Sequence, residues 1–214
     1  MNAYRHVLFD LDGTLIDSIG LILDSYRHTL EAHGLPPHSE EAFRRGVGTP
    51  LRVQFAPWAR DDAQMEAMIA TYREYNLAHH DARVRAFPGV PETVRELRAS
   101  GVGVAIVTSK NRQGALRGLR AAGLDRDVEV VVAVDDVARP KPDREPVDLA
   151  LSRLGADPGT ALFVGDSVHD LRSGRAAGVA TGAAGWGTLD RAHLEAEEPT
   201  HWLRSPADLL GLGR

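Results

Sequence analysis

The sequence contains no cysteine. This absence excludes a disulfide scaffold, catalysis by a thiol and metal sites built from thiolates. Lysine is nearly absent as well, because the 214 residues include 23 arginines but only two lysines, Lys110 and Lys141. A lysine retained in such an arginine-rich chain can mark a position that needs a compact point charge, and chance is the alternative explanation.

The sequence also lacks long apolar runs and an excess of basic charge. No stretch approaches the roughly 18 apolar residues of a membrane span, and residues 1–10 have no signal-peptide core. The formal net charge is −5 and no cluster of Lys and Arg is present, which disfavours binding to nucleic acid or to a membrane surface. We therefore expect a soluble, cytoplasmic globular protein with one large domain, or with one domain and a smaller insert.

Short apolar runs with the composition of buried parallel strands are distributed along the chain. They cover residues 6–9, 103–107, 128–132 and 161–164, and a weaker run covers 179–182. Helical patterns over 90–99, 113–122, 146–154 and 168–177 lie between them, and each ends close to a glycine, as helices often do. The alternation predicts an α/β fold with a Rossmann-like parallel sheet and helices on both faces.

The segment after the first predicted strand breaks this alternation. It has helical patterns over residues 19–32, from Ser39 onward and over 62–80, but no convincing strand. These patterns predict a small all-helical cap domain at 17–82, inserted into a core domain formed by 1–16 and 83–214. Its methionines and tyrosines recur at three- and four-residue steps, so we expect them in the core of the insert.

Polar residues follow the predicted strands at one edge of the sheet, where open parallel sheets bind ligands. They include Asp10, Asp12, Gly13, Thr108, Ser109, Lys110, Lys141, Asp166 and Asp170. Close carboxylates repel one another unless a cation lies between them, and oxygen ligands without thiolate favour Mg²⁺ over zinc. The alternative for Asp-x-Asp-Gly is a turn held by its own side chains. An EF-hand is excluded, because Leu15 and Leu21 stand where that loop needs Gly and Glu.

Four ordered motifs carry a resemblance to a known family. Asp10-Leu-Asp-Gly-Thr-Leu15, Val107-Thr108-Ser109, Lys141-Pro142 and Gly165-Asp166-Ser-x-x-Asp170 resemble the motifs of the haloacid dehalogenase superfamily. The resemblance spans essentially the whole chain and includes the helical insert after the first motif. Segments such as 75–81 and 135–137 are similar to the branch of phosphoglycolate phosphatases and inorganic pyrophosphatases. Arg144 is a departure, since the family often has proline there.

The resemblance implies a Mg²⁺-dependent phosphatase acting on a small phosphorylated metabolite or pyrophosphate through an aspartyl-phosphate. It implies that Asp10 is the nucleophile, that Asp12 is the general acid and base, and that Lys141 neutralises charge. Thr108 and Ser109 would hold the phosphoryl group, with Gly13 and Lys110 beside the substrate. The implied metal ligands are Asp10, Asp12 (through its carbonyl), Asp166 and Asp170. Because the dehalogenating branch lacks the second aspartate, we expect phosphoryl chemistry rather than carbon–halogen cleavage.

Several alternatives remain open at this point. A phosphomutase like β-phosphoglucomutase uses the same scaffold, and a non-catalytic protein could sense phosphate or Mg²⁺ with the same acids. Arg44, Arg45 and Arg52 in the insert are candidates to clamp a second phosphate or a carboxylate, or they form a solvated helix face. His79 and His80 near the end of the insert are expected to be structural or close to the substrate. We expect a monomer or a weak homodimer.

Overall fold

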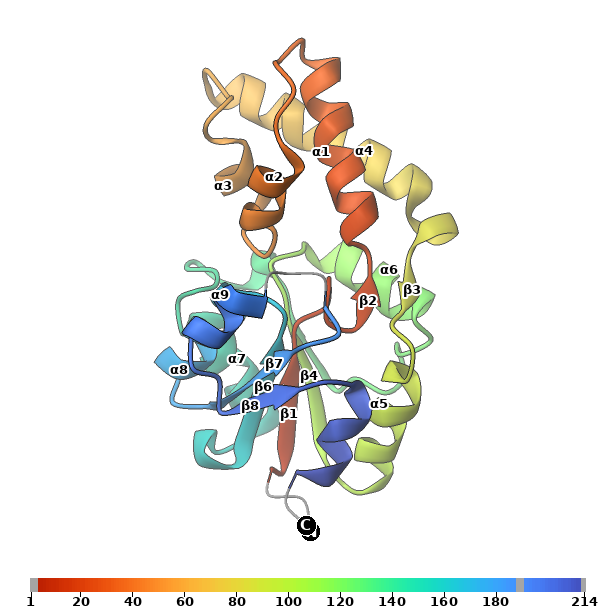
Figure 1. Ribbon diagram of the computed structural model, residues 1–214, viewed down its shortest axis with the longest axis vertical. Coiled ribbons are helices and arrows are strands. Elements are labelled where there is room, and N and C mark those ends of the chain that lie inside the picture. Colours follow the sequence, from red (N-terminus) through yellow and green to blue (C-terminus); the bar gives the residue numbers. More distant parts are fainter. Residues whose placement is uncertain (1–3, 188–190, 213–214) are drawn as a thin grey trace.

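The computed structural model describes residues 4–187 and 191–212, apart from the side chain of Arg45. A six-stranded parallel sheet forms the lower half of the molecule in Figure 1. In spatial order its strands are β5 (Val130–Val132), β4 (Gly103–Val107), β1 (His6–Phe9), β6 (Ala161–Gly165), β7 (Ala180–Ala184) and β8 (His201–Leu203). The predicted α/β fold with a parallel sheet is therefore confirmed.

The central position of β1 determines where the sheet can bind a ligand. The chain adds β4 and β5 on one side of β1, and then returns to add β6, β7 and β8 on the other side. Such a reversal leaves a crevice beyond the carboxyl ends of the strands that flank it, here β4, β1 and β6. The edge strand β8 was not predicted, because it has three residues and two of them are only half-buried.

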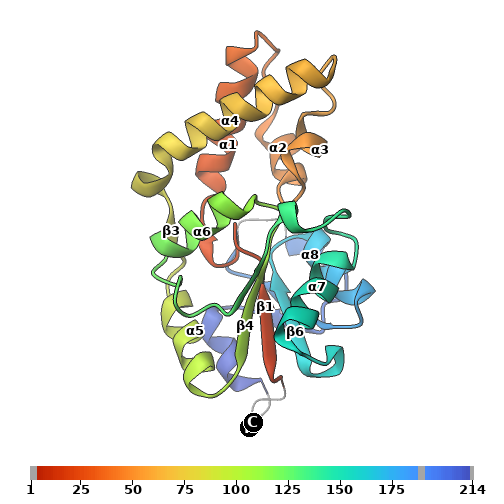
Figure 2. The ribbon, with the colours of Figure 1, turned by 180° about the vertical axis from the view of Figure 1, so that it is seen from behind.

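Helices cover both faces of the sheet (Figures 1 and 2). On one face lie α5 (Val90–Ala99), α6 (Arg112–Ala121) and the 3₁₀ helix Pro206–Gly211, and on the other lie α7 (Glu145–Leu154) and α8 (Val168–Ala176), with α9 (Arg191–Ala196) against α8. Alternate strand residues supply the two cores, because successive side chains of a strand point to opposite faces. Phe9 packs in the first core and Leu8 in the second.

The insert after β1 is helical, as expected, and stands over the carboxyl ends of the strands (Figure 1). It contains α1 (Ile19–Ala32), α2 (Glu40–Gly46), α3 (Leu51–Phe55) and α4 (Asp62–Arg83), and α1 packs along α4. The insert has its own core, in which the predicted Met65, Met68 and Tyr72 are buried and the Tyr26 and Phe43 rings stack at 5.3 Å. Two short strands, β2 (Ile16–Asp17) and β3 (Arg85–Ala86), pair antiparallel where the chain enters and leaves it.

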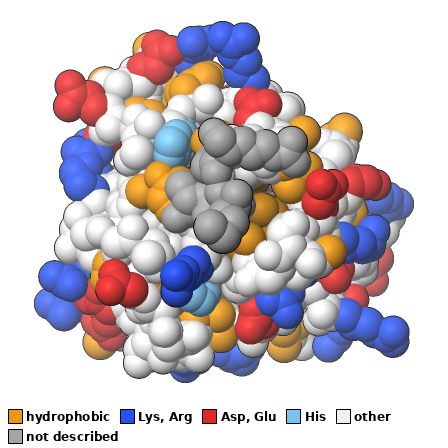
Figure 3. Space-filling view, turned by 90° about the horizontal axis from the view of Figure 1, so that it is seen from below, with side chains coloured by type: hydrophobic (Ala, Val, Ile, Leu, Met, Phe, Trp, Pro, Cys, Tyr) orange, Lys and Arg blue, Asp and Glu red, His pale blue; other side chains and the backbone are white. Residues whose placement is uncertain are grey.

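The face of the molecule opposite the insert is shown in Figure 3. Acidic and basic side chains are scattered around its edge, and they do not gather into a continuous basic surface in the described part of this face. Among residues 4–187 and 191–212, no helix is both long enough and apolar enough to cross a membrane.

Candidate active site

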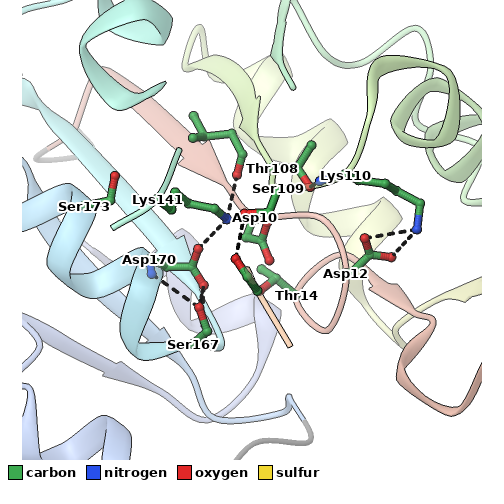
Figure 4. Close-up of polar contacts among 12 residues, drawn as sticks. Asp10, Asp12, Thr14, Thr108, Ser109, Lys110, Lys141, Ser167, Asp170 and Ser173 are labelled. Atoms are coloured by element: carbon green, nitrogen blue, oxygen red, sulfur yellow. Dashed lines mark hydrogen bonds and ion pairs between the residues drawn. The ribbon is translucent and has the colours of Figure 1, made fainter. Parts of the chain in front are cut away.

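Asp10 and Asp12 follow β1, but their side chains point to different partners (Figure 4). The strand ends at Phe9, and the Leu11 carbonyl accepts three backbone N–H groups from the turn that follows. Gly13 has φ of +84°, a left-handed conformation that suits glycine. On a continuous strand, Asp10 and Asp12, two residues apart, would share a face of the sheet. The strand does not continue, and the turn separates them.

Lys141 is buried between two carboxylates. Its Nζ lies 2.8 Å from Asp10 Oδ1, 2.6 Å from Asp170 Oδ1 and 3.2 Å from the carbonyl oxygen of Val107. The three N–H bonds of the ammonium thus meet three acceptors, and the side chain is only 1% exposed. Burial alone lowers the pKa of Lys141, but the negative charges of Asp10 and Asp170 outweigh burial and hold that pKa above its usual value.

Asp10, Asp166 and Asp170 form a cluster that fits a metal ion. One carboxylate oxygen from each lies within 4.8 Å of the others. Asp166 Oδ1 accepts a hydrogen bond from the Thr14 hydroxyl at 3.1 Å, whereas the buried Asp166 Oδ2 has no hydrogen-bond partner among residues 4–187 and 191–212. Burying an unpaired carboxylate oxygen is costly, and a cation would remove that cost. Oxygen ligands of this kind suit a hard divalent cation.

Burial also changes the protonation of this cluster. Burial, together with the negative charge of Asp170, raises the pKa of Asp10 to about 7 against the opposing effect of Lys141. Burial raises the pKa of Asp166 as well, with the negative charges of Asp10 and Asp170 acting in the same direction. A divalent cation must therefore displace protons from these carboxyl groups when it binds.

Asp12 is held by the other lysine of the chain. Lys110 Nζ lies 3.0 and 3.1 Å from the two oxygens of Asp12, and the Ser18 hydroxyl donates to Asp12 Oδ1 at 2.6 Å. The Asp12 side chain is consequently not part of the metal cluster. Both lysines that stand out by their rarity are thus bound to the two carboxylates after β1, although the chain separates Lys110 from Asp12 by 98 positions.

The residues after β4 connect the sheet to the insert. Thr108 is buried, and its Oγ accepts the backbone N–H of Lys110 at 3.1 Å. The Ser109 hydroxyl donates to the carbonyl oxygen of Gly48 at 2.6 Å, which ties β4 to the loop between α2 and α3. The Ser109 hydroxyl is therefore occupied by its contact with Gly48.

A cavity of about 710 Å³ lies between the sheet and the insert. Its floor includes Asp10, Asp12 and Thr108 from the sheet, and Tyr72 and Asn76 of α4 line it from above. Because the helical insert stands over the crevice at the carboxyl ends of the strands, a ligand over Asp10 would lie between the sheet and the insert.

The three arginines of the insert that are candidates for a substrate clamp, or for a solvated helix face, have different surroundings. Arg44 pairs with Glu40 one turn earlier in α2 and does not line the cavity. Arg52 lines it but is held by ion pairs with Asp62 and Glu66. The side chain of Arg45 lies outside the described part of the structure.

His79 and His80, near the end of the insert, lie outside the cavity as the structure describes it. His79 is exposed, and its ring bonds the carbonyl oxygen of Tyr75. His80 is buried, with Nδ1 3.0 Å from Asp81, and Asp81 binds Arg117 of α6 through both carboxylate oxygens. This geometry agrees with a structural role at the junction of α4 with α6.

Sequence reasoning missed several residues around the cavity. Ser18 carried no local signal, because its contact with Asp12 depends on the turn after β1. Ser167 caps α8 and donates to Asp170 Oδ2 at 2.6 Å. That role could have been found, since Ser-x-x-Asp before a helix is a capping box. Arg73 of α4 also lines the cavity and was not singled out.

Comparison with known proteins agrees with this geometry. A family model described as haloacid dehalogenase-like hydrolase matches residues 7–184. Pyrophosphatase PpaX from Bacillus cereus is 44% identical over 204 residues, which cover 95% of this chain and 94% of that relative. Pyrophosphatase PpaX from Halalkalibacterium halodurans is 41% identical over 206 residues, which cover 96% of this chain and 95% of that relative. The crystal structure of a protein assigned as a phosphoglycolate phosphatase from Lactobacillus plantarum has a TM-score of 0.88 at 28% identity, covering 99% of this chain and all of that one. This chain therefore belongs to the haloacid dehalogenase-like hydrolase family, as its four motifs predicted.

Proposed function

We propose that this chain is a Mg²⁺-dependent phosphatase that hydrolyses pyrophosphate or a small phosphate monoester, with Asp10 as the nucleophile. The observation that carries the proposal is the buried contact between Asp10 and Lys141 at the floor of the cavity. A carboxylate held by an ammonium group is suited to attack phosphorus, because the ammonium offsets the negative charge that an incoming phosphate adds. The pyrophosphatases at 41% and 44% identity support a phosphoanhydride as substrate.

The reaction would take two steps. Asp10 Oδ2 has no hydrogen bond among the described residues, so this oxygen is available to attack phosphorus while Lys141 holds Oδ1. The bond from phosphorus to the leaving oxygen breaks, its electron pair stays on that oxygen, and the Asp12 carboxyl group donates a proton to it. Water then attacks phosphorus of the aspartyl-phosphate, Asp12 takes up the proton from this water, and orthophosphate leaves as Asp10 is restored.

Other residues of the site would hold the phosphoryl group and exclude water. Thr108 and the backbone N–H of Ser109, which line the cavity floor, would bind its oxygens. Gly13 leaves room for the carboxylate of Asp166, since a side chain there would overlap it. Residues 17–82 would act as a cap domain that closes over the bound substrate, which strengthens electrostatic interactions in the site.

The acidic cluster would hold the metal ion through Asp10 and Asp166. Both oxygens of Asp170 are already engaged, one by Lys141 and the other by Ser167, so Asp170 would act through these neighbours or through water. The predicted ligand from Asp12 would be its carbonyl oxygen, because its side chain is held by Lys110. When bound, Mg²⁺ would supply positive charge that stabilises the oxygens of the transferring group.

The proposal is tested by a panel of pyrophosphate, phosphoglycolate, sugar phosphates and nucleotides, assayed for orthophosphate release with Mg²⁺ and with EDTA. We expect Mg²⁺-dependent release that the Asp10→Asn variant loses. Asp125→Asn is the matched control, because it removes the same charge from an exposed position before β5. Hydrolysis that persists in Asp10→Asn would contradict the assignment of Asp10 as nucleophile. Isomerisation of a sugar phosphate without orthophosphate release would favour the phosphomutase.

A further inference from the structure

The cationic side chains that line the cavity differ in whether they have a partner. Three of the described lining residues are cationic, namely Arg52, Arg73 and Lys110. Lys110 is neutralised by Asp12, and two carboxylates hold Arg52. Arg73 has neither a hydrogen bond nor an ion pair within residues 4–187 and 191–212. It is the positive charge that the described cavity leaves uncompensated.

The local sequence explains why Arg73 has no partner. Residues three and four positions apart are neighbours on a helix surface. For Arg73 in α4 these neighbours are Ile69, Ala70, Asn76 and Leu77, and none of them is acidic. Arginines elsewhere in the chain do pair at this spacing. Arg44 pairs with Glu40 in α2, and Arg144 pairs with Asp148 at the start of α7. The guanidinium group of Arg73 therefore remains available to a ligand.

The position of Arg73 within the cavity indicates which part of a ligand it would meet. Leu77, one turn further along α4, lines the same cavity, so this stripe of the helix faces the cavity while Arg73 itself is exposed. Asp10 lies at the floor, on the sheet. In phosphoryl transfer the attacking and leaving oxygens lie roughly in line with phosphorus between them. The leaving group must therefore extend away from Asp10, toward the wall formed by the insert.

We propose that Arg73 is a specificity-determining residue that binds an anionic group on the leaving portion of the substrate. This inference rests on the proposed function and names its substrate class: phosphates whose leaving group carries a negative charge of its own, such as the second phosphate of pyrophosphate or a carboxylate. A guanidinium group binds both through paired N–H donors. Orthophosphate, which fills only the phosphoryl position, would not reach Arg73.

The test measures binding in the Asp10→Asn background, where turnover is not needed. Inorganic pyrophosphate and orthophosphate are titrated by calorimetry with Mg²⁺ present, into the Asp10→Asn protein and into the same protein that also carries Arg73→Met. Loss of a hydrogen bond to a charged group predicts that Arg73→Met weakens pyrophosphate binding about 10- to 100-fold. The same change should alter orthophosphate binding by less than about threefold. Arg126→Met is the matched control, because Arg126 is exposed in the loop before β5, at the opposite edge of the sheet.

Each outcome decides the inference. Selective loss of pyrophosphate affinity in Arg73→Met, with Arg126→Met unchanged, supports it. Equal weakening of both anions, no weakening of either, an equal effect of Arg126→Met or no pyrophosphate binding at all would overturn it. Because these measurements need no catalysis, they are separate from the turnover assay with Asp10 intact, in which the proposed function itself succeeds or fails.

Discussion

Replacement of Lys141 by methionine removes the ammonium group from the most buried ion-pair cluster of the site. Methionine keeps an unbranched side chain of similar length, so the change removes charge with little loss of volume. In the structure this ammonium lies 2.8 Å from Asp10 and 2.6 Å from Asp170, and their side chains are 4% and 0% exposed. The variant therefore leaves two buried carboxylates without their shared cation.

The expected cost depends on pH. Removing one partner of a buried ion pair typically costs about 3–5 kcal/mol, and we expect that loss at about pH 8. Without the ammonium, the two carboxylates facing Lys141→Met take up a proton at a higher pH than in the unmodified protein, where the pKa of Asp10 is about 7. That proton reduces the cost by about 1.4 kcal/mol for each pH unit between 8 and about 7, below which the unmodified protein binds it too, so the loss should be about 1 kcal/mol smaller near pH 5.5.

Urea denaturation of metal-free protein at the two pH values measures this difference. Lys141→Arg is the comparison, because it keeps the charge but places a larger planar group where an ammonium meets three acceptors. Overpacking should cost it about 1–3 kcal/mol. That cost should be nearly independent of pH, since the carboxylates keep a cationic neighbour. Both variants should lose most of the phosphatase activity.

Two results would refute this reasoning. A destabilisation by Lys141→Met of less than about 1 kcal/mol at pH 8 would mean that the buried carboxylates do not need the ammonium. An equal cost at both pH values would mean that the loss arises from packing and not from charge.

Three further predictions concern the metal cluster and the contact between sheet and insert. Gly13→Ala places a methyl group against Asp166 at a positive φ, and should weaken Mg²⁺ binding at least about tenfold by titration and cost about 1–2 kcal/mol of stability. Folding raises the pKa of Asp10 from 3.8 to about 7, so the protonated form stabilises the metal-free fold below that range, and this contribution is lost as the pH rises through 7. Mg²⁺ must displace that proton, so it should raise the melting temperature more at about pH 8 than at about pH 5.5, and an equal rise would contradict the assignment of these ligands. Ser109→Ala removes the hydrogen bond to the Gly48 carbonyl and should lower the free energy of unfolding, measured with urea, by about 1 kcal/mol. An unchanged free energy of unfolding in the variant would contradict this prediction.

Much of the fold could be predicted because its signals are local. The strands 6–9 and 103–107 match β1 and β4, and the helices 19–32 and 90–99 match α1 and α5. Strands buried in the sheet are apolar throughout, and helices packed on the sheet have apolar residues at helical spacing. Each residue of such a segment therefore contributes to the signal. The end of α4 was less well predicted, since this helix continues to Arg83 instead of ending at His80.

The acids and lysines of the site could also be found from sequence, because parallel strands bring their carboxyl ends to one edge and four motifs follow those ends. The scarcity of lysine pointed to the same place. Lys141 and Lys110 are the chain's only lysines, and both bind a carboxylate after β1. What sequence determined on its own was therefore the type of fold, the edge that carries the chemistry and the residues gathered there.

Only the tertiary structure decided which of these charged groups face one another. The turn at Gly13 directs Asp10 into the metal cluster and Asp12 away from it, and this direction depends on backbone geometry that spacing does not record. Ion pairs across the insert occupy Arg52, whereas Arg73 remains free to meet a ligand in the described cavity. The partner of a charge depends on distances between elements far apart in the chain, and those distances exist only once the sheet and the insert have packed.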